Sequence, residues 1–138
     1  MSESRIPTID LQGADALLLC DASEHNADLY WATDLMAPDP FHYLCDGKRS
    51  IVLMKDLELD RARDQSCCEV LAYSGFEPAT GESGDALHNA LSELGYKHLL
   101  VPAEFPLGIA NKLVAAGFQL TTAGTPLFTE RAIKTASQ

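Results

Sequence analysis

The chain has 138 residues and a mass of 14.9 kDa, which is the size of one compact domain rather than two. With 46% hydrophobic and 22% charged residues, its composition is that of an ordinary globular protein and excludes the disordered, collagen-like and disulfide-framework classes. Its formal net charge of -10 at pH 7 would repel phosphate groups, so neither nucleic acid nor an anionic membrane is expected as a partner.

The N-terminal sequence and the cysteines predict the cellular compartment. Residues 1–10 carry acidic and polar side chains where a signal peptide needs basic residues and an apolar stretch, and no apolar run approaches transmembrane length. We therefore expect a cytoplasmic protein. Its cysteines, Cys20, Cys45, Cys67 and Cys68, show no CxxC spacing and are interpreted as buried thiols. A disulfide between adjacent cysteines would be strained, which favours ordinary thiols over a redox switch.

The first predicted strand is a short apolar run. Residues 16–20 read Ala-Leu-Leu-Leu-Cys between Asp15 and Asp21, and a run that is apolar throughout is typical of a central strand covered on both faces. Ser23 is then predicted to cap a helix over residues 24–33. The Ala-Pro-Asp-Pro sequence that follows ends this helix, because each proline disfavours the helical conformation of its predecessor.

A hairpin is predicted next. Apolar runs at 41–45 and 50–55 are separated by Asp46-Gly47-Lys48-Arg49, and Asp-Gly between two such runs is a strong hairpin signal. The same residues resemble the end of a phosphate-binding loop. That loop needs a glycine five positions before its lysine, where this chain has Tyr43, and a helix after it. The hairpin is therefore the favoured interpretation.

Helices and strands alternate in the rest of the chain. A short charged helix is predicted over 57–64 and a strand over 69–73. An amphipathic helix begins at Ser83 or Asp85 and ends before Gly95, which favours a left-handed stop. Its inward positions repeat at helical spacing and are Leu87, Ala90, Leu91 and Leu94.

The last elements complete the predicted fold. A strand over 98–101 precedes a helix that opens at Pro106 and closes at Gly117, and a strand follows over 118–121. The inward residues of this helix are predicted to be Ile109, Ala110, Leu113 and Val114. Strands that alternate with helices predict an α/β domain, and the hairpin makes its sheet mixed. We expect a three-layer α/β/α fold with a mixed sheet of about six strands.

The common catalytic motifs are absent from the sequence. There is no GxGxxG, HExxH or GxSxG, which removes the usual dinucleotide, zinc-protease and serine-hydrolase signals. The histidines, His25, His42, His88 and His98, have no i, i+4 spacing that would place two imidazoles on one metal ion. No metal site is expected within the chain, and His88 and His98 are interpreted as surface or strand-end residues.

A receiver-type phosphoacceptor domain is an alternative for a small acidic α/β chain. Asp21 would fit the aspartate that ends the first strand of such a domain. The receiver fold requires a strictly alternating parallel order and a lysine at the end of its fifth strand. The hairpin breaks that order and Pro102 stands where the lysine is expected, so this alternative is disfavoured.

One segment is more specific than the rest. Residues 28–41, Asp-Leu-Tyr-Trp-Ala-Thr-Asp-Leu-Met-Ala-Pro-Asp-Pro-Phe, resemble the first helix and following loop of the creatinase/prolidase N-terminal domain. This domain precedes the catalytic domain of Xaa-Pro aminopeptidases and prolidases. The strand at 16–21 with Ser23, the hairpin and residues 131–135 agree with the resemblance. Asp34 stands where many relatives have glycine, and Asp tolerates a left-handed backbone better than most residues.

The resemblance also implies how the chain is organised. Residues 1–138 would form one N-terminal domain with a ribonuclease H-like fold, and 130–138 would begin the linker to an absent catalytic domain. Thr135-Ala136-Ser137-Gln138 has the form of a capping box, which normally starts a helix. We weigh two interpretations evenly: a chance match in a polar tail, or the front piece of a longer protein.

The function implied by the resemblance is a supporting one. In this family the catalytic pita-bread domain binds two divalent metal ions through aspartate, histidine and glutamate ligands, none of which has a counterpart in this chain. The resemblance therefore implies a chain that is inactive alone, within a parent hydrolase that cleaves short proline-containing peptides. The N-terminal domain commonly forms homodimers and leans a loop toward the partner subunit's active site. That implies Asp34, Asp39 and His42 as candidates at the substrate entrance, and Tyr30 and Trp31 as interface candidates.

Structural interpretations of the same residues stay open. Tyr30 and Trp31 share helical spacing with Ala27, a pattern more typical of a core than of an interface. Asp34 and Asp39 also suit ordinary solvated turns. A further alternative for the whole chain is a stand-alone peptide- or protein-binding module of the same fold with no enzymatic parent.

Overall fold

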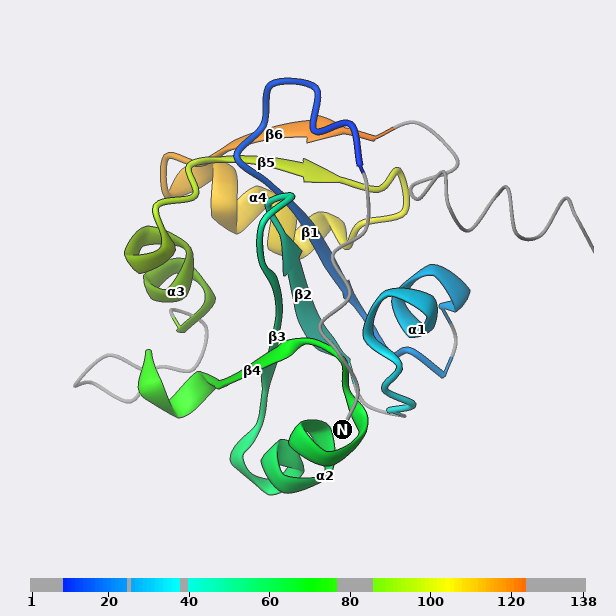
Figure 1. Cartoon of the computed structure of the whole chain (residues 1–138). Helices are drawn as coiled ribbons and strands as arrows, with labels where there is room; N and C mark the ends of the chain where they lie inside the picture. Colours follow the sequence, from blue (N-terminus) through cyan, green and yellow to red (C-terminus); the bar gives the residue numbers. More distant parts are fainter. Residues whose placement is uncertain (1–8, 25, 38–39, 77–85, 124–138) are drawn as a thin grey trace, which may run out of the picture.

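Figure 1 shows the computed structural model of the protein, which describes residues 9–24, 26–37, 40–76 and 86–123. The strands are β1 (Ala16–Asp21), β2 (Phe41–Cys45), β3 (Ser50–Met54), β4 (Glu69–Ala72), β5 (His98–Val101) and β6 (Gln119–Thr122). The helices are α1 (Ala27–Thr33), α2 (Leu59–Gln65), α3 (Ala86–Leu94) and α4 (Leu107–Ala115), with 3-10 turns η1 (Asp56–Glu58) and η2 (Tyr73–Gly75). The predicted residues 83–85 and 124–138, including the linker and the capping box, lie outside the described residues.

The strands form one mixed sheet of six strands in the order β4-β3-β2-β1-β5-β6. β2 is antiparallel to both of its neighbours, β1 and β3, whereas the β1–β5, β3–β4 and β5–β6 pairs are parallel. All strands except β2 therefore run in the same direction. This confirms the predicted mixed α/β sheet.

Helices cover both faces of the sheet (Figure 1). Residues of α1 and α2 pack in one core with Leu17 and Leu19, and residues of α3 and α4 pack in a second core with Ala16 and Leu18. Successive side chains of a strand point to opposite faces, so the burial of residues 16–19 of β1 on both faces requires an apolar residue at each of these positions. The three-layer α/β/α architecture follows from this one strand.

The hairpin between β2 and β3 is confirmed, and a carboxylate closes its turn. The Asp46 Oδ1 atom accepts hydrogen bonds from the backbone N–H groups of Lys48 at 2.8 Å and Arg49 at 2.6 Å. Gly47 has φ 88°, a left-handed conformation that other residues adopt at a cost. The Arg49 guanidinium then pairs with the Glu69 carboxylate at 2.6 Å and joins the turn to β4.

The predicted start of the first helix is wrong. The cap of α1 is Asn26, whose side chain accepts a hydrogen bond from the Leu29 N–H at 3.0 Å, and the helix begins at Ala27 rather than residue 24. Ser23 is instead buried, and its hydroxyl donates to the Leu35 carbonyl at 2.5 Å and accepts from the Ala37 N–H at 2.8 Å. These two hydrogen bonds join the segments before and after α1. They occupy the Ser23 hydroxyl, which is then not available to cap the helix.

One predicted core position of α4 is also wrong. Leu113 is buried and Ile109 partly buried, but the side chain of Val114 is 58% exposed. Ile109 and Leu113 are one helical turn apart and face the sheet together, whereas Val114 is rotated by about 100° from Leu113. The predicted inward positions of α3 are confirmed, and the glycines after α3 and α4 adopt the expected positive φ, 84° at Gly95 and 100° at Gly117.

The cysteines agree with their interpretation as ordinary thiols. All of them lie in the described residues as free thiols; Cys45 and Cys67 are buried as predicted, whereas Cys20 and Cys68 are only partly buried. In the part of the chain that the structure describes, no helix has the length and apolarity that crossing a membrane requires.

Asp34 ends α1 in the left-handed conformation, with φ 56°, as the sequence predicts. Because this conformation strains a β-branched residue and suits glycine, we expect Asp34→Val to be about 1–2 kcal/mol less stable than Asp34→Gly. Both variants lack the carboxylate, so their difference isolates the backbone effect. Urea unfolding measures it, and equal unfolding free energies for the two variants would contradict the assignment.

Candidate functional site

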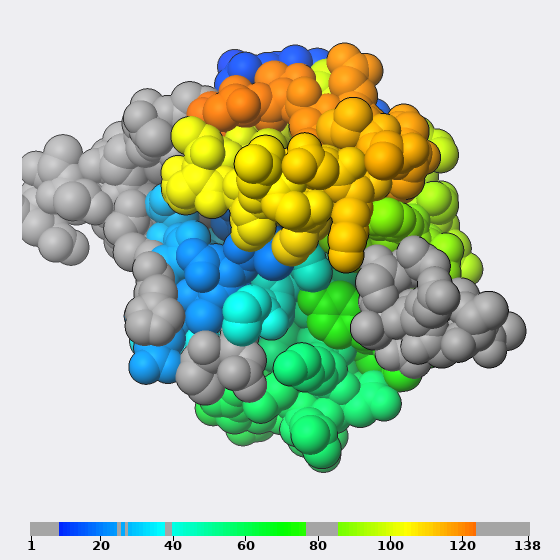
Figure 2. Space-filling view, turned by 180° about the vertical axis from the view of Figure 1, so that it is seen from behind, coloured from blue at the N-terminus to red at the C-terminus, as the bar shows by residue number. Residues whose placement is uncertain are grey.

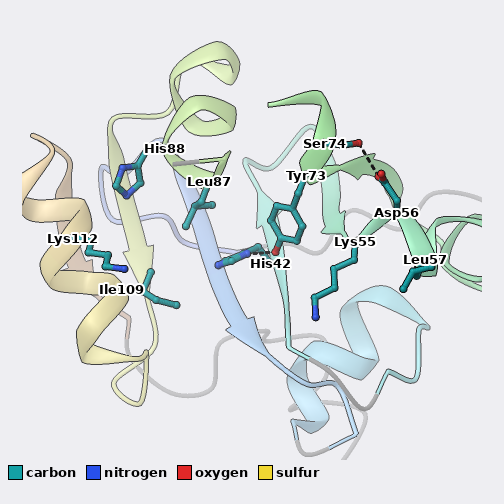
Figure 3. Close-up of a pocket in the computed structure, with 10 residues that line it drawn as sticks. All are labelled: His42, Lys55, Asp56, Leu57, Tyr73, Ser74, Leu87, His88, Ile109 and Lys112. Atoms are coloured by element: carbon teal, nitrogen blue, oxygen red, sulfur yellow. Dashed lines mark hydrogen bonds between the residues drawn. The ribbon is translucent and has the colours of Figure 1, made fainter. Parts of the chain in front are cut away.

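A pocket of about 440 Å³ opens on the face of the sheet that α3 and α4 cover. We call it the His42 pocket. Its polar lining consists of His42, Lys55, Tyr73, His88 and Lys112 together with Asp56 and Ser74. Its apolar lining consists of Leu57, Leu87 and Ile109. Figure 2 shows this face of the molecule, where the surface is hollowed below α4, and Figure 3 shows the lining side chains.

The direction of the strands brings these residues together. Lys55 directly follows β3 and Tyr73 directly follows β4, and the two strands are parallel neighbours. Their carboxyl ends therefore meet at one edge of the sheet. Because β2 runs the opposite way, His42 near its start lies at the same edge. In open α/β sheets, ligands commonly bind outside the carboxyl ends of the strands.

His42 is the most deeply placed polar residue of the pocket. Its Nδ1 atom is hydrogen-bonded to the Tyr73 hydroxyl, and the two rings meet edge to face with centroids 5.6 Å apart at 87°. Its Nε2 atom is buried and has no hydrogen-bond partner among the described residues. Buried polar atoms are nearly always hydrogen-bonded, so this atom is an exception that requires an explanation.

Burial holds the groups around His42 in their neutral forms. It lowers the pKa of His42 from 6.5 to about 4 and raises the pKa of Tyr73. It also raises the pKa of the Cys20 thiol, whose residue pairs with His42 across β1 and β2, to about 11, with a smaller contribution from Asp21. At neutral pH the Tyr73 hydroxyl is thus protonated, and we assign it as the donor in its hydrogen bond with Nδ1. We infer that Nε2 then carries the ring hydrogen and is a hydrogen-bond donor.

The rim of the pocket is positively charged. Lys55 and Lys112 are exposed, and neither forms an ion pair within the described ranges. The Asp56 carboxylate accepts a hydrogen bond from the Ser74 hydroxyl at 2.7 Å, and this bond turns the carboxylate toward Ser74. Although the chain has a net charge of -10, two of its lysines and two of its histidines line this one cavity. This arrangement suits a ligand that accepts hydrogen bonds and carries negative charge.

The described residues do not fit the metal ions that the resemblance implies for a parent enzyme. Across residues 9–24, 26–37, 40–76 and 86–123, no three His, Cys, Asp or Glu side chains are grouped so that they could hold an ion.

The structure places the predicted entrance residues on different sides of the sheet. His42 lines the pocket on the α3 and α4 face. Asp34 ends α1, which packs on the opposite face, so the two side chains are not brought together. Asp39 lies outside the described residues. The assignment of these residues to a substrate entrance stays a prediction.

The predicted interface residues differ in exposure. Tyr30 is 44% exposed, while Trp31 is partly buried and packs against the core beneath α1. The pocket residues Lys55, Tyr73 and Lys112 were not singled out by the sequence, because they come from separate segments. The sequence signal that could identify two of them is a polar side chain directly after each of two neighbouring strands, Lys55 after β3 and Tyr73 after β4.

Comparisons with known proteins bear on the fold. The sequence matches no family model and no curated protein. The structure is similar to the prolidase of Pyrococcus horikoshii OT3, with 16% identity and a TM-score of 0.57 over 81% of this chain and 29% of that one. It is similar to the X-Pro aminopeptidase of Thermotoga maritima MSB8, with 14% identity and a TM-score of 0.65 over 80% of this chain and 31% of that one.

A third structure matches along most of both chains. It is the creatinase/prolidase N-terminal domain of an X-Pro dipeptidase from Streptococcus pyogenes, with 13% identity and a TM-score of 0.59 over 80% of this chain and 83% of that one. The chain thus spans less than a third of the two full-length enzymes and most of the separate domain. It has the fold of the creatinase/prolidase N-terminal domain, as the resemblance implies.

Because His42 is buried in its neutral form, we predict that the stability of the fold depends on pH. Its folded pKa of about 4 lies below the ordinary value of 6.5, so between these values the unfolded chain takes up a proton that the folded chain does not. Stability should therefore fall as the pH drops from 6.5 toward 4, by at most about 1.4 kcal/mol per pH unit from this group. Urea unfolding of the unmodified chain and of His42→Phe measures the difference.

A matched control separates His42 from the other titrating groups. Asp15 and Asp46, whose pKa values hydrogen bonds lower, titrate in every variant and cancel in the comparison. Leu107→Phe introduces a phenylalanine at an exposed apolar position of α4 without removing a titrating group, and should keep the pH dependence of the unmodified chain. Parallel curves for the unmodified chain and His42→Phe would refute the neutral burial of His42.

Proposed function

We propose that this chain is the non-catalytic N-terminal domain of an Xaa-Pro metallopeptidase, either an aminopeptidase or a dipeptidase. The observation that carries the proposal is the match with the N-terminal domain of the Streptococcus pyogenes dipeptidase, which covers about four-fifths of each chain. The role is to support subunit association and to shape the substrate entrance. Hydrolysis of short proline-containing peptides belongs, in this proposal, to a pita-bread domain elsewhere in the parent protein, which also holds its two metal ions.

The surface of α1 is the proposed contact between subunits of a homodimer. Tyr30 and Met36 are each 44% exposed, and the neighbouring Trp31 is partly buried and packs against the core. Aromatic and methionine side chains are enriched in protein interfaces, where a large apolar area is buried with little loss of side-chain entropy. A rigid helix that is fixed by Trp31 would present Tyr30 to the partner in one orientation.

The proposed entrance residues have separate tasks. Asp34 is held at the end of α1 by its left-handed backbone, close to the proposed subunit contact, where a carboxylate suits the positive amino terminus of a short peptide. Asp39 follows five residues later in the sequence. His42 is the second residue of the next strand and would act from the other face of the sheet. We place the parent protein in the cytoplasm, as the sequence predicts.

A second candidate function is a stand-alone peptide- or protein-binding module of the same fold. The His42 pocket favours it, because the described residues form this cavity without help from another domain. Sequencing the gene beyond the codon for Gln138 separates the two candidates. A downstream set of aspartate, histidine and glutamate ligands supports the peptidase, whereas an immediate stop codon supports the module.

The proposal predicts that the chain does not hydrolyse peptides by itself. With added Mn²⁺, the purified chain should release no proline from Ala-Pro above the rate without protein, because a metal-bound water needs a ligand set to lower its pKa. Chromatographic detection of proline measures the rate. Metal-dependent release by the purified chain would refute the non-catalytic assignment.

The proposal also predicts self-association through α1. Sedimentation over a range of concentrations should show a monomer–dimer equilibrium, and Tyr30→Asp should weaken it about tenfold or more by placing a charge in the contact. Leu107→Asp is the matched control, because Leu107 is an apolar side chain of α4 that is 73% exposed. A monomer at all concentrations, or equal effects of both variants, would contradict the role of α1.

A further inference from the structure

The walls of the His42 pocket combine an apolar body with a polar end. Leu87 from α3 and Ile109 from α4 form its apolar sides, and Leu57, whose side chain is 95% exposed, stands at its rim. The volume of about 440 Å³ lies within the range of small-molecule sites, which is roughly 300–1,000 Å³. Such sites are mainly apolar and contain a few polar groups that orient the ligand.

The polar end of the pocket lacks a partner. Figure 3 shows the imidazole of His42 and the side chain of Lys112 pointing toward one another from opposite walls, with Leu87 and Ile109 beside them. The buried Nε2 atom of His42 makes no hydrogen bond to the described residues. A buried donor without an acceptor destabilises the fold, because it has given up its hydrogen bonds to water. A ligand oxygen between His42 and Lys112 would satisfy this donor.

The charges of the pocket determine the sign of the ligand. Lys55 and Lys112 line it against the single carboxylate of Asp56, so positive charge is in excess and the lining favours anions over cations. Among the described residues, the lining contains no arginine, the residue that binds phosphate through paired donors. One buried imidazole and one or two ammonium groups match the demands of a single carboxylate better than those of a dianionic phosphate.

We propose that the His42 pocket binds a small monocarboxylate with an apolar body, whose carboxylate accepts a hydrogen bond from His42 Nε2 and pairs with Lys112. The apolar body lies between Leu87 and Ile109, and Lys55 attracts the anion from the rim. Tyr73 is a positioning residue, because its bond to Nδ1 directs the Nε2 hydrogen into the cavity. The inference does not depend on the proposed function.

The chemistry of this ligand could come from a free metabolite-sized acid or from the C-terminus of a peptide. The first test uses the unmodified chain and two pairs of probes. One pair is 4-phenylbutyrate and its primary amide, and the other is acetyl-Ala-Phe with a free or an amidated C-terminus. Titrations followed by NMR of the histidine rings and backbone amides report both affinity and location.

The expected result is selective binding of carboxylates. 4-Phenylbutyrate should bind at least about tenfold more tightly than its amide, shift the His42 and His88 ring signals, and bind more weakly as salt is added. If the peptide acid binds as well as 4-phenylbutyrate, the site accepts peptide C-termini; if it does not, the site is for free small acids. Equal binding of acid and amide, or no binding at about 10 mM, would overturn the proposal.

Variants then test the assigned residues. Lys112→Met removes the ammonium but keeps the length of the side chain, and should weaken 4-phenylbutyrate binding about fivefold or more. Lys48→Met is the matched control, because Lys48 is an exposed lysine in the turn between β2 and β3, away from the pocket lining, and should leave binding within about twofold.

A variant of Tyr73 tests whether its hydroxyl group sets the tautomer of His42 or whether its ring only fills space. Tyr73→Phe keeps the ring but removes the hydroxyl bonded to Nδ1, so the ring hydrogen of His42 can move to Nδ1. We expect weaker carboxylate binding and a changed tautomer in the nitrogen chemical shifts of His42. Unchanged affinity and tautomer would refute the positioning role, and the probe titrations of the unmodified chain stay decisive if a variant fails to fold.

Discussion

The burial of β1 on both faces is the constraint on which the rest of the structure depends. Ala16 to Leu19 are apolar at every position and buried in two separate cores. A strand of this kind requires a neighbour on each side and a helical layer above and below. The antiparallel β2 and the parallel β5 supply the neighbours. At the start of β1, the Asp15 carboxylate accepts hydrogen bonds from the N–H groups of Lys97 and His98 and fixes its alignment with β5.

The reversal at β2 produces the candidate site as a consequence of this pairing. If β2 ran with the other strands, its start would lie at the opposite edge of the sheet and His42 would be far from Tyr73. The antiparallel direction places His42 among the strand ends, where the chain leaves the sheet in η1 and η2. A histidine on the second position of a buried strand is thereby covered on its inner side yet open toward a cavity. This position lowers the pKa of His42 while the ring still lines the pocket.

The sequence predicts the parts of the fold that depend on local chemistry. The apolar run of β1, the Asp-Gly turn and the glycines after α3 and α4 each carry their structural reason within a few residues. Ser23 and Val114 were misassigned because their surroundings depend on distant segments: the hydroxyl of Ser23 binds the backbone after α1, and the orientation of α4 decides which side Val114 faces. His42 was singled out, but its partners Tyr73 and Lys112 could not be, because the pairing of β3 with β4 and the packing of α4 bring them to it.

The proposed subunit contact on α1 and the His42 pocket lie on opposite faces of the sheet. This separation decides whether binding at one of them can affect the other. Tyr30 lies on α1 and Asp34 caps its end, whereas His42 of β2 and Lys112 of α4 line the pocket on the other face. The rigid β1 and β2 pair stands between them, and distant sites without shared partners contribute independently to stability. A ligand in the pocket could influence subunit contact only if it biased two arrangements of the sheet, and the close-packed strands oppose such a change. Carboxylate binding and subunit association are therefore expected to be independent properties, which this fold can carry at the same time without compromise between them.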